Sequence, residues 1–256
     1  MDTSKNSYYR NVSGRGNALK TAILDLALAF SSYPRLLLEV FIRKNFGQRY
    51  FSLSSVITLI VILAAFPFIS PSTIFHHYAQ DGESIFPAYL LWYVFLAAFL
   101  LLGIKRHREI VLGPSVYNFE KYSLFSGEIN PFIRNFEING KKANIRVIET
   151  IYEPALFFIA GLFLMLIHQK LGGLLVGCSI LYSLSYMGAY NLGDHFIMDQ
   201  IDEIICNEEL GNVFVEGMDA KDAKYFEMRA ERPENKTMRR KISQQIGERR
   251  QPVEVE

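Results

Sequence analysis

The chain has 256 residues, of which 50% are hydrophobic and 14% aromatic, and its formal net charge is +1. A charge this close to zero gives no overall field that would favour nucleic acid or a strongly acidic partner. The two cysteines, Cys178 and Cys206, are too few for a disulfide scaffold and suit a reducing cytoplasm. Four long stretches carry almost no charge, which is typical of membrane-spanning segments.

Residues 1–51 are predicted to form a cytoplasmic segment with interfacial helices. The first charge-free apolar run begins only near Leu53, so no secretory signal pattern is present and we expect the segment to be retained. Residues 18–30 and 35–46 are largely apolar, and the serines and proline at 31–34 are expected to separate them into two helices. Two placements are open for these helices: the plane of the membrane interface, or the protein's own cytoplasmic part.

The sequence predicts an α-helical integral membrane protein with two transmembrane hairpins, at 52–104 and 154–190. A helix needs about 20 apolar residues to cross the hydrocarbon core. The four apolar stretches are 52–70, 86–104, 154–168 and 171–190. The third is short, so a full crossing and a re-entrant pair with the fourth are both open. None of the four contains Asp, Glu, Lys or Arg, which disfavours an ion-coupled transporter.

Lys and Arg set the predicted orientation. They number eight in residues 1–51, eight in 105–153 and ten from 191 onward, whereas the turn between the last two spans has one and the loop 72–85 has none. Because positive charge is retained on the cytoplasmic side, both termini and the central loop are expected there. The expected location is the bacterial inner membrane, where the lipids are the first partners.

Residues 105–153 are predicted to form a small β-rich cytoplasmic insert. Residues 110–112 precede a Gly-Pro pair and suggest a strand and a turn, and 116–119 suggest a second strand. The Asn-Gly pair at 139–140 is a strong hairpin signal. In the alternative interpretation, the chain after Lys142 is a helix that runs directly into the third span.

Residues 191–230 are predicted to form amphipathic cytoplasmic helices, and residues 231–256 a disordered charged tail. Within 191–207 the isoleucines fall on one helical face and most polar residues on the other. A second helix is predicted at 220–230. The tail is rich in Pro, Glu, Lys, Arg and Gln, a composition that cannot bury a core.

A pair of glycines in the fourth span is the candidate helix-packing site. Gly173 and Gly177 are four residues apart, a spacing that lets two helix backbones approach closely. We expect them to pack against Ala160 and Gly161 of the third span. Self-association of the chain through the same face, giving a homo-oligomer, is the alternative.

Two groups of polar residues are candidate chemical sites. His195, Asp199 and Asp202 have a spacing that could place an imidazole and two carboxylates toward one divalent metal ion. The favoured interpretation is the solvated side of an amphipathic helix. Glu149 and Glu153 could support acid–base chemistry, but we expect them to be favourable charges near the start of the third span.

The chain contains no P-loop, Rossmann glycine pattern, zinc-protease motif, hydrolase nucleophile elbow or Cys-x-x-Cys pair. We therefore expect no catalytic residue, metal or cofactor, and no specific nucleic-acid partner. The expected function is a non-enzymatic membrane subunit that anchors or scaffolds an assembly through protein partners on the cytoplasmic face. This layout is similar in kind to accessory membrane subunits of bacterial secretion or conjugation machines. A channel or transporter subunit is the alternative, followed by a membrane enzyme at the inner interface.

Overall fold

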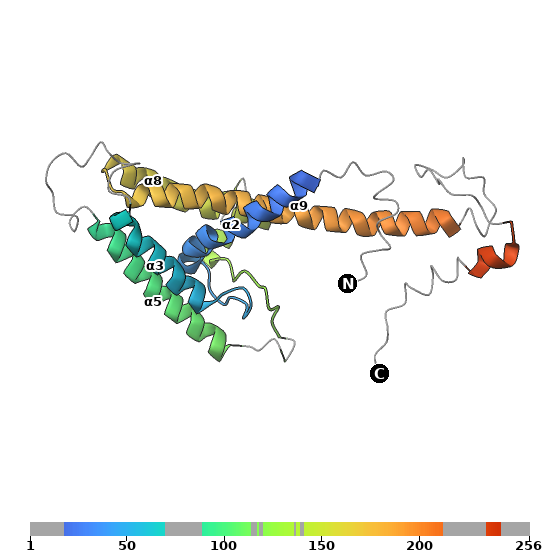
Figure 1. Ribbon diagram of the computed structural model, residues 1–256, viewed down its shortest axis with the longest axis horizontal. Helices are drawn as coiled ribbons and strands as arrows, with labels where there is room; N and C mark the ends of the chain where they lie inside the picture. The colour runs from blue at the N-terminus through green and yellow to red at the C-terminus, as the bar shows by residue number, and fades with distance from the viewer. Residues whose placement is uncertain are drawn as a thin grey trace. The chain divides into compact units, whose positions relative to one another are not determined.

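The computed structural model describes residues 18–69, 89–113, 117, 120–135, 137–138, 141–211 and 234–241. In chain order the elements are α2 (Ala18–Ile42), α3 (Leu53–Ile69), α5 (Leu90–Leu112), α6 (Pro131–Arg134), β1 (Glu137–Ile138), β2 (Lys141–Lys142), α7 (Ile145–Val147), the π-helix η3 (Ile148–Tyr152), α8 (Glu153–Leu166) and α9 (Leu171–Gly211) (Figure 1). The chain divides into two compact units, Asn17–Tyr190 and the remainder. The candidate site lies wholly within Asn17–Tyr190.

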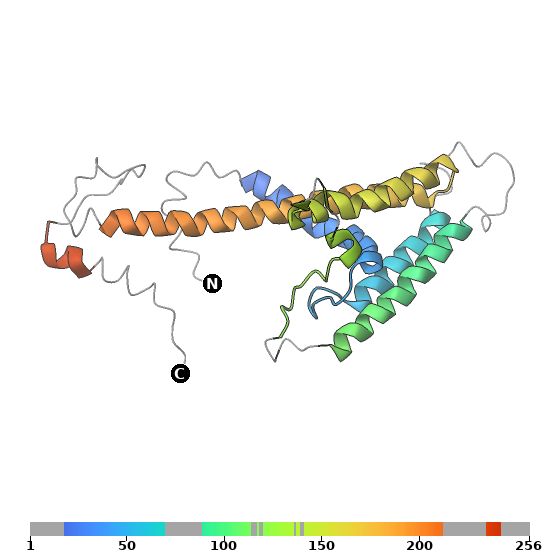
Figure 2. The same cartoon turned by 180° about the vertical axis from the view of Figure 1, so that it is seen from behind.

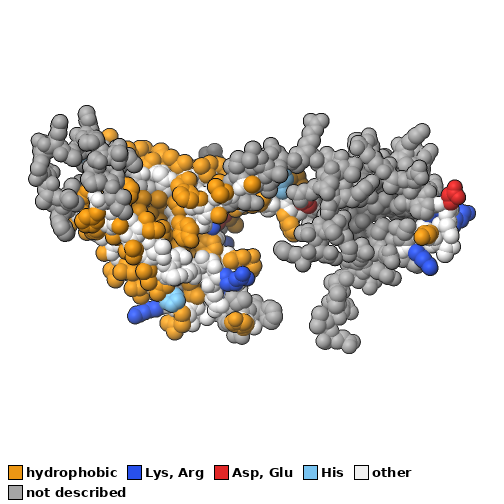
Figure 3. Space-filling model, viewed as in Figure 1, with side chains coloured by type: hydrophobic (Ala, Val, Ile, Leu, Met, Phe, Trp, Pro, Cys, Tyr) orange, Lys and Arg blue, Asp and Glu red, His pale blue; other side chains and the backbone are white. Residues whose placement is uncertain are grey.

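Within the described part of the chain, three helical stretches are long and apolar enough to cross a membrane. They are Leu90–Leu112, Ile145–Leu166 and Leu171–Cys206, while Leu53–Phe68 is a shorter apolar helix. Hydrophobic side chains cover much of the visible surface of these helices (Figure 3), and so large an exposed apolar surface suits lipid rather than water. The protein is therefore mostly helical, with three candidate spans, which fits an α-helical membrane protein.

Helices α3 and α5 lie side by side in both views (Figures 1 and 2). Gly103 of α5 allows this close approach, because a Cβ there would lie 2.8 Å from a methyl group of Val56 in α3. Pro67 lies inside α3 and cannot donate a hydrogen bond to the carbonyl of Leu63. Trp92 of α5 donates its Nε1–H to that carbonyl at 2.9 Å, so the polar group is satisfied within an apolar helix pair.

Helices α8 and α9 form the second pair, joined by a tight turn at His168, which has a φ of 57°. The two backbones approach most closely at Gly161 and Gly172: a Cβ on Gly172 would lie 2.5 Å from the carbonyl oxygen of Gly161. A Cβ on Gly173 or Gly177 would meet nothing within 4 Å, and Ala160 is exposed. The contact predicted for Gly173 and Gly177 is therefore corrected, because the face of α9 turned toward α8 runs through Gly172.

Helix α2 is continuous, and the break predicted at residues 31–34 does not occur. Ser31 donates its hydroxyl to the carbonyl of Ala27, so the serine satisfies the helix backbone instead of ending it. Pro34 is accommodated inside the helix. The two halves differ in burial: residues 36–40 are buried, whereas Phe30 is 70% exposed.

The buried half of α2 packs on the protein itself, which favours one of the two placements left open by the sequence. Its leucines and Val40 belong to the hydrophobic core, and Phe41 stacks on Phe95 of α5 with ring centroids 5.0 Å apart. One side of the first half also contacts the protein, because a Cβ on Gly188 of α9 would be only 2.8 Å from Leu28. The first half of α2 keeps an exposed apolar side with Leu26 and Phe30. Such a surface suits the membrane interface, so the two predicted placements apply to different halves of one helix.

The positive residues after the second apolar stretch end that stretch but not its helix. α5 continues to Leu112, so the strand predicted at 110–112 is wrong. Arg106 is buried and donates to the carbonyl of Val40 near the end of α2 at 3.3 Å, and to Glu109 at 2.9 Å. Both contacts stabilise a continued helix, because they satisfy the guanidinium and a terminal carbonyl together.

A short hairpin forms at the predicted Asn-Gly turn. β1 and β2 pair antiparallel with Glu137 opposite Lys142 and Ile138 opposite Lys141. Each strand has two residues, and the stretch from Ile145 onward is helical into α8, as the alternative interpretation predicted. The described residues of this segment therefore do not form a β-rich insert. The strand predicted at 116–119 lies outside the described residues, except for Tyr117.

Helix α9 runs without interruption to Gly211, so the amphipathic helix predicted at 191–207 continues the fourth apolar stretch. The helix predicted at 220–230 lies outside the described residues. A short helix occupies residues 236–241, where disorder was predicted. Asn235 caps it, since its side-chain oxygen accepts from the N–H of Thr237 at 2.9 Å.

Candidate functional site

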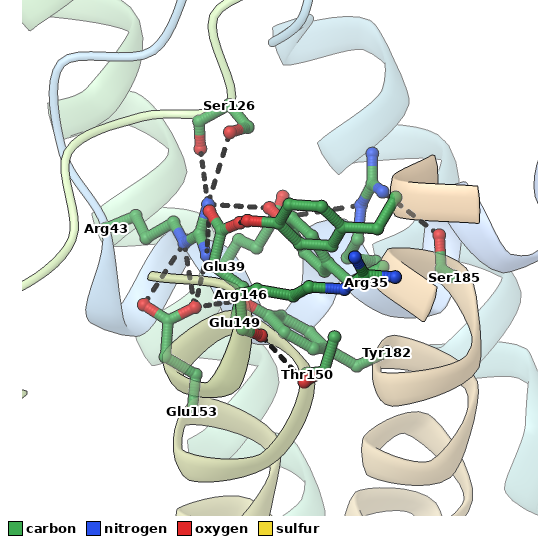
Figure 4. A network of polar contacts seen from close by, with 12 residues as sticks. Arg35, Glu39, Arg43, Ser126, Arg146, Glu149, Thr150, Glu153, Tyr182 and Ser185 are labelled. Carbon is green, nitrogen blue, oxygen red and sulfur yellow. Dashed lines mark hydrogen bonds and ion pairs between the residues drawn. The ribbon is translucent and has the colours of Figure 1, made fainter. Parts of the chain in front are cut away.

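A cluster of charged and hydroxyl-bearing side chains, with Glu39, Arg43 and Glu153 buried at its centre, joins α2 to η3, α8 and α9 (Figure 4). We call it the Arg43 cluster, after the residue at its centre. Its members are Arg35, Glu39, Arg43, Tyr50, Ser126, Arg146, Glu149, Glu153, Tyr182, Ser185, Tyr186 and Tyr190.

Helix α2 contributes three charged residues with a spacing of four. Arg35, Glu39 and Arg43 therefore lie along one side of the helix. Arg43 follows the last residue of α2, but its N–H donates to the carbonyl of Glu39 at 2.7 Å, so the helical turn continues through it. The three side chains point toward η3 and α9.

The π-helical turn η3 positions the two carboxylates of the second segment. The N–H of Glu153 donates to the carbonyl of Ile148, five residues earlier. Pro154 follows and has no N–H for the carbonyl of Thr150, and Ser183 of α9 donates its hydroxyl to that carbonyl at 2.7 Å. A π-turn of this kind shifts the facing of the side chains that follow it, and here Glu149 and Glu153 both reach Arg43.

Helix α9 contributes three tyrosines, again four residues apart. Tyr182 donates to Glu153 at 2.5 Å, and Tyr186 donates to Glu39 at 2.7 Å. Tyr190 donates to Glu149. One face of α9 thus supplies a phenol to each carboxylate of the cluster.

Arg43 is fully buried, and acceptors surround its guanidinium on every side. Nε lies 3.2 and 3.1 Å from the two carboxylate oxygens of Glu153. Nη1 donates to the hydroxyl of Tyr186 at 2.6 Å and to that of Ser126 at 3.2 Å. Nη2 contacts Glu153 and lies 3.1 Å from Glu149. These contacts occupy the five donors of the guanidinium group.

Glu39 is the second centre of the cluster and is 1% exposed. It accepts from Tyr186 and, at 2.5 Å, from the hydroxyl of Tyr50. Arg35 lies 3.4 Å from the same carboxylate and donates to Ser185 of α9 at 3.0 Å. Burial raises the pKa of Tyr50, and the neighbouring Glu39 carboxylate raises it further, so Tyr50 remains a neutral donor at physiological pH.

Two arginines, Arg35 and Arg43, form ion pairs with the three glutamates at positions 39, 149 and 153. Arg146 is exposed and lies over the ring of Tyr190. A buried ion pair costs desolvation energy that is recovered only with good geometry and further hydrogen bonds. The tyrosines and serines supply those bonds. The arrangement therefore holds four segments of the chain in one geometry, and removal of one charged member leaves the others uncompensated.

The hydrogen bonds around Arg43, Glu39 and Glu153 limit the chemistry available at the centre of the cluster, although Nε of Arg35 is buried without a hydrogen bond and lies 3.4 Å from Glu39. The carboxylates of Glu39 and Glu153 already accept from arginine and tyrosine donors, so neither is free to bind a metal or take a proton from a substrate. Within the part of the chain that the structure describes, no three His, Cys, Asp or Glu side chains gather to hold a metal ion. The geometry is that of a network of ion pairs and hydrogen bonds that connects helices.

Of the two polar groups predicted from the sequence, one lies outside the Arg43 cluster and the other forms part of it. His195 and Asp202 are exposed on α9, and Asp199 is half-buried; none of them belongs to the Arg43 cluster. Glu149 lies in the first turn of η3 and Glu153 in the first turn of α8 beside Pro154, as the sequence predicted, and both carboxylates also contact Arg43. The candidate span Ile145–Leu166 begins before the predicted stretch 154–168 and includes these charged residues.

Sequence reasoning missed the basic and phenolic members of the cluster. A signal was present, because charged or phenolic residues recur every four positions in each contributing segment: 35, 39 and 43; 149 and 153; 182, 186 and 190. Each pattern alone resembles the polar side of an amphipathic helix. Only the packing of the three segments brings the patterns together.

The described residues fit an α-helical membrane protein in which a network of ion pairs and hydrogen bonds connects α2 to η3, α8 and α9. Comparison with models of protein families, with curated proteins and with solved structures found no match to this chain. Its function is therefore argued from the geometry of the cluster and the helices.

Proposed function

We propose that the protein is a non-enzymatic membrane subunit that anchors or scaffolds a larger assembly from the cytoplasmic side. The observation that carries the proposal is the saturated Arg43 cluster. Its central guanidinium and its buried carboxylates bind one another and leave no group poised for catalysis. Such a cluster fixes α2 rigidly on the membrane helices, and rigid presentation of a surface is what an anchoring subunit requires.

The distribution of polar groups along the spans argues against a transport path. A path for ions or polar solutes needs polar groups through the whole depth of the membrane. Residues 155–166 of α8 contain no charged, amide or hydroxyl side chain. The cluster is confined to the end of α8 where the chain enters the helix, so a channel or transporter is the weaker alternative.

The proposal includes four spans with both termini in the cytoplasm. α3 is 17 residues long and free of charge, close to the length that a crossing requires. It pairs with α5 along its length, as expected for a transmembrane hairpin. Because 26 of the 27 Lys and Arg residues lie outside the four predicted apolar stretches and on one predicted side of them, we place that side in the cytoplasm of a bacterial inner membrane. An accessory role in a secretion or conjugation-type machine is the assembly we propose.

The test is the composition of the particle isolated from native membranes. Tagged protein is extracted in a mild detergent after cross-linking in the membrane, and native mass spectrometry measures the mass of the particle. The proposal predicts a particle of fixed stoichiometry with other proteins. A lone monomer in several detergents and after cross-linking would overturn it, as would solute flux into vesicles that contain the protein alone.

A matched pair of variants ties the assembly to the cluster. Glu153→Gln keeps the shape of a buried side chain but removes the charge opposite Arg43, and should release the partners while the protein stays in the membrane. Gly173→Ala is the control, since a Cβ there meets nothing within 4 Å. If both variants keep the same partners, the cluster stabilises the subunit without presenting α2 to the assembly.

A further inference from the structure

Helix α9 has an exposed apolar face in its last third. The candidate span Leu171–Cys206 is longer than the about 20 residues that a crossing needs, and residues 191–206 contain four Asp and Glu residues, so we infer that this part extends beyond the hydrocarbon core. Ile197, Met198, Ile201 and Ile205 are 55, 47, 50 and 44% exposed. At 100° per residue these four side chains fall within an arc of about 100° on the helix. Continuous exposed apolar faces of this kind usually mark a binding surface.

The charge of this segment restricts what can cover the face. Residues 191–211 contain six Asp and Glu residues and no Lys or Arg. Anionic lipid would repel the segment, and a second copy of the same helix would bring like charges together. The charge complement is a basic amphipathic helix.

The chain carries such a segment itself. Residues 236–250 contain six Lys and Arg residues and one Glu. Their apolar residues Met238, Ile242 and Ile246 are spaced by four, as on one side of a helix. Residues 236–241 are already helical, and Met238 is 57% exposed.

The connection between the two segments permits contact within one molecule. Residues 212–235 can span on the order of 80 Å when extended, whereas the acidic segment 191–211 is about 30 Å long. A tether of this length gives the tail an effective concentration on the order of millimolar. A weak intrinsic affinity is therefore sufficient for docking.

We propose that the basic segment 236–250 docks as an amphipathic helix on the Ile197–Ile205 face of α9 in the same molecule. Its apolar residues cover the isoleucines, and its arginines and lysines lie against the acidic residues that flank the face. This inference goes beyond the proposed function, because it assigns an internal partner to α9 and does not depend on any assembly.

Disulfide formation in the full-length protein in nanodiscs tests the proposal. One variant combines Ile201→Cys and Ile242→Cys in a Cys206→Ser background. The matched control carries Ile242→Cys alone, so that its partner is the native Cys206, which lies about 140° around the helix from Ile201. Buried Cys178 is present in both. Mild copper-catalysed oxidation should join positions 201 and 242 at least fivefold faster than positions 206 and 242, within a monomer.

Two further measurements separate docking from random collision. The preference should fall to about onefold in 1 M NaCl, which screens exposed charges, and with Arg239→Glu, Arg240→Glu and Lys241→Glu combined. Equal rates at positions 201 and 206 at low salt would overturn the proposal. A product of dimer size would also overturn it, because the occupant would then be the tail of a second copy. Ile201 is exposed, so its replacement leaves the bundle intact.

Discussion

Trp92 donates its indole N–H to the backbone carbonyl of Leu63 across the contact between α3 and α5. Leu63 lies four residues before Pro67, so its carbonyl would be without a donor in an isolated helix. The second hairpin repeats the arrangement, with Ser183 as the donor to the carbonyl four residues before Pro154. In both pairs, a side chain of one helix replaces the donor that a proline removes from the other.

Replacement of Trp92 by Phe should therefore lower the free energy of unfolding by about 1–3 kcal/mol, because a buried carbonyl is left unsatisfied. Unfolding in mixed micelles measures the loss. The control background is Pro67→Ala, which restores a backbone N–H to Leu63. If Trp92→Phe lowers the free energy of unfolding by the same amount in that background as in the original chain, the indole stabilises the protein through packing and not through the hydrogen bond.

The Arg43–Glu153 pair makes a second prediction. Glu153→Leu should destabilise the protein by about 3–5 kcal/mol, since it leaves a buried guanidinium without its main counter-charge. Arg43→Met should cost a similar amount. The double variant should lose much less than the sum of the two, because no uncompensated partner of the pair remains. Additive losses would contradict a coupled pair and would place the cost in packing.

The hydrophobic runs predicted the apolar helices, and the Asn-Gly pair predicted the short hairpin. The Arg43 cluster could not be predicted in the same way. Its charged members have side chains of types that are solvated in most proteins, and their burial depends on the packing of α2 against α9, which lies close to α2 at Gly188. That packing is a long-range contact, and no local pattern in residues 18–42 specifies it.

Local sequence signals also failed to predict that two helices continue past residues typical of a helix end. Ser31 and Pro34 are typical of a break, yet the serine bonds back to its own helix and α2 continues. Lys105 and Arg106 end an apolar run. Arg106 nevertheless donates hydrogen bonds to the carbonyl of Val40 and to Glu109, and the helix extends by two turns. In each case a contact supplied by the folded chain decides the outcome.

The close approach of α8 and α9 makes a third prediction, with neighbouring glycines as test and control. Gly172→Val should separate the two helices and lower the unfolding temperature, because even a Cβ would lie 2.5 Å from the carbonyl of Gly161. Gly173→Val should have little effect, since the space beside it is open. Parallel thermal unfolding in the same detergent measures both. Equal losses for the two variants would contradict the helix contact described here.

Tyr50 makes a prediction about pH. Its pKa is raised by burial and by Glu39, so the folded state favours the neutral phenol more than the unfolded state does. This contribution to stability is complete below the ordinary tyrosine pKa of about 10 and is lost as the pH rises above it. Between pH 8 and 11 the wild type should therefore lose stability more steeply than Tyr50→Phe. Tyr33→Phe, at an exposed position, should follow the wild type; if Tyr50→Phe does so as well, the phenol does not titrate with folding.

The proposed topology places residues 72–85 outside and residues 105–153 inside, and single thiols can test both. In a Cys206→Ser background, Gln80→Cys should react with a membrane-impermeant maleimide on intact cells. Lys142→Cys, in the strand β2, should react only after the membrane is permeabilised. Native Cys206 in the unmodified chain provides a control for the second behaviour, because it lies after residue 190, where the predicted fourth apolar stretch ends, on the proposed cytoplasmic side. If positions 80 and 142 react alike on intact cells, α5 does not cross the membrane between them and the first hairpin is not transmembrane. Only the candidate spans at Ile145–Leu166 and Leu171–Cys206 would then remain, and the proposed four-span topology would be wrong.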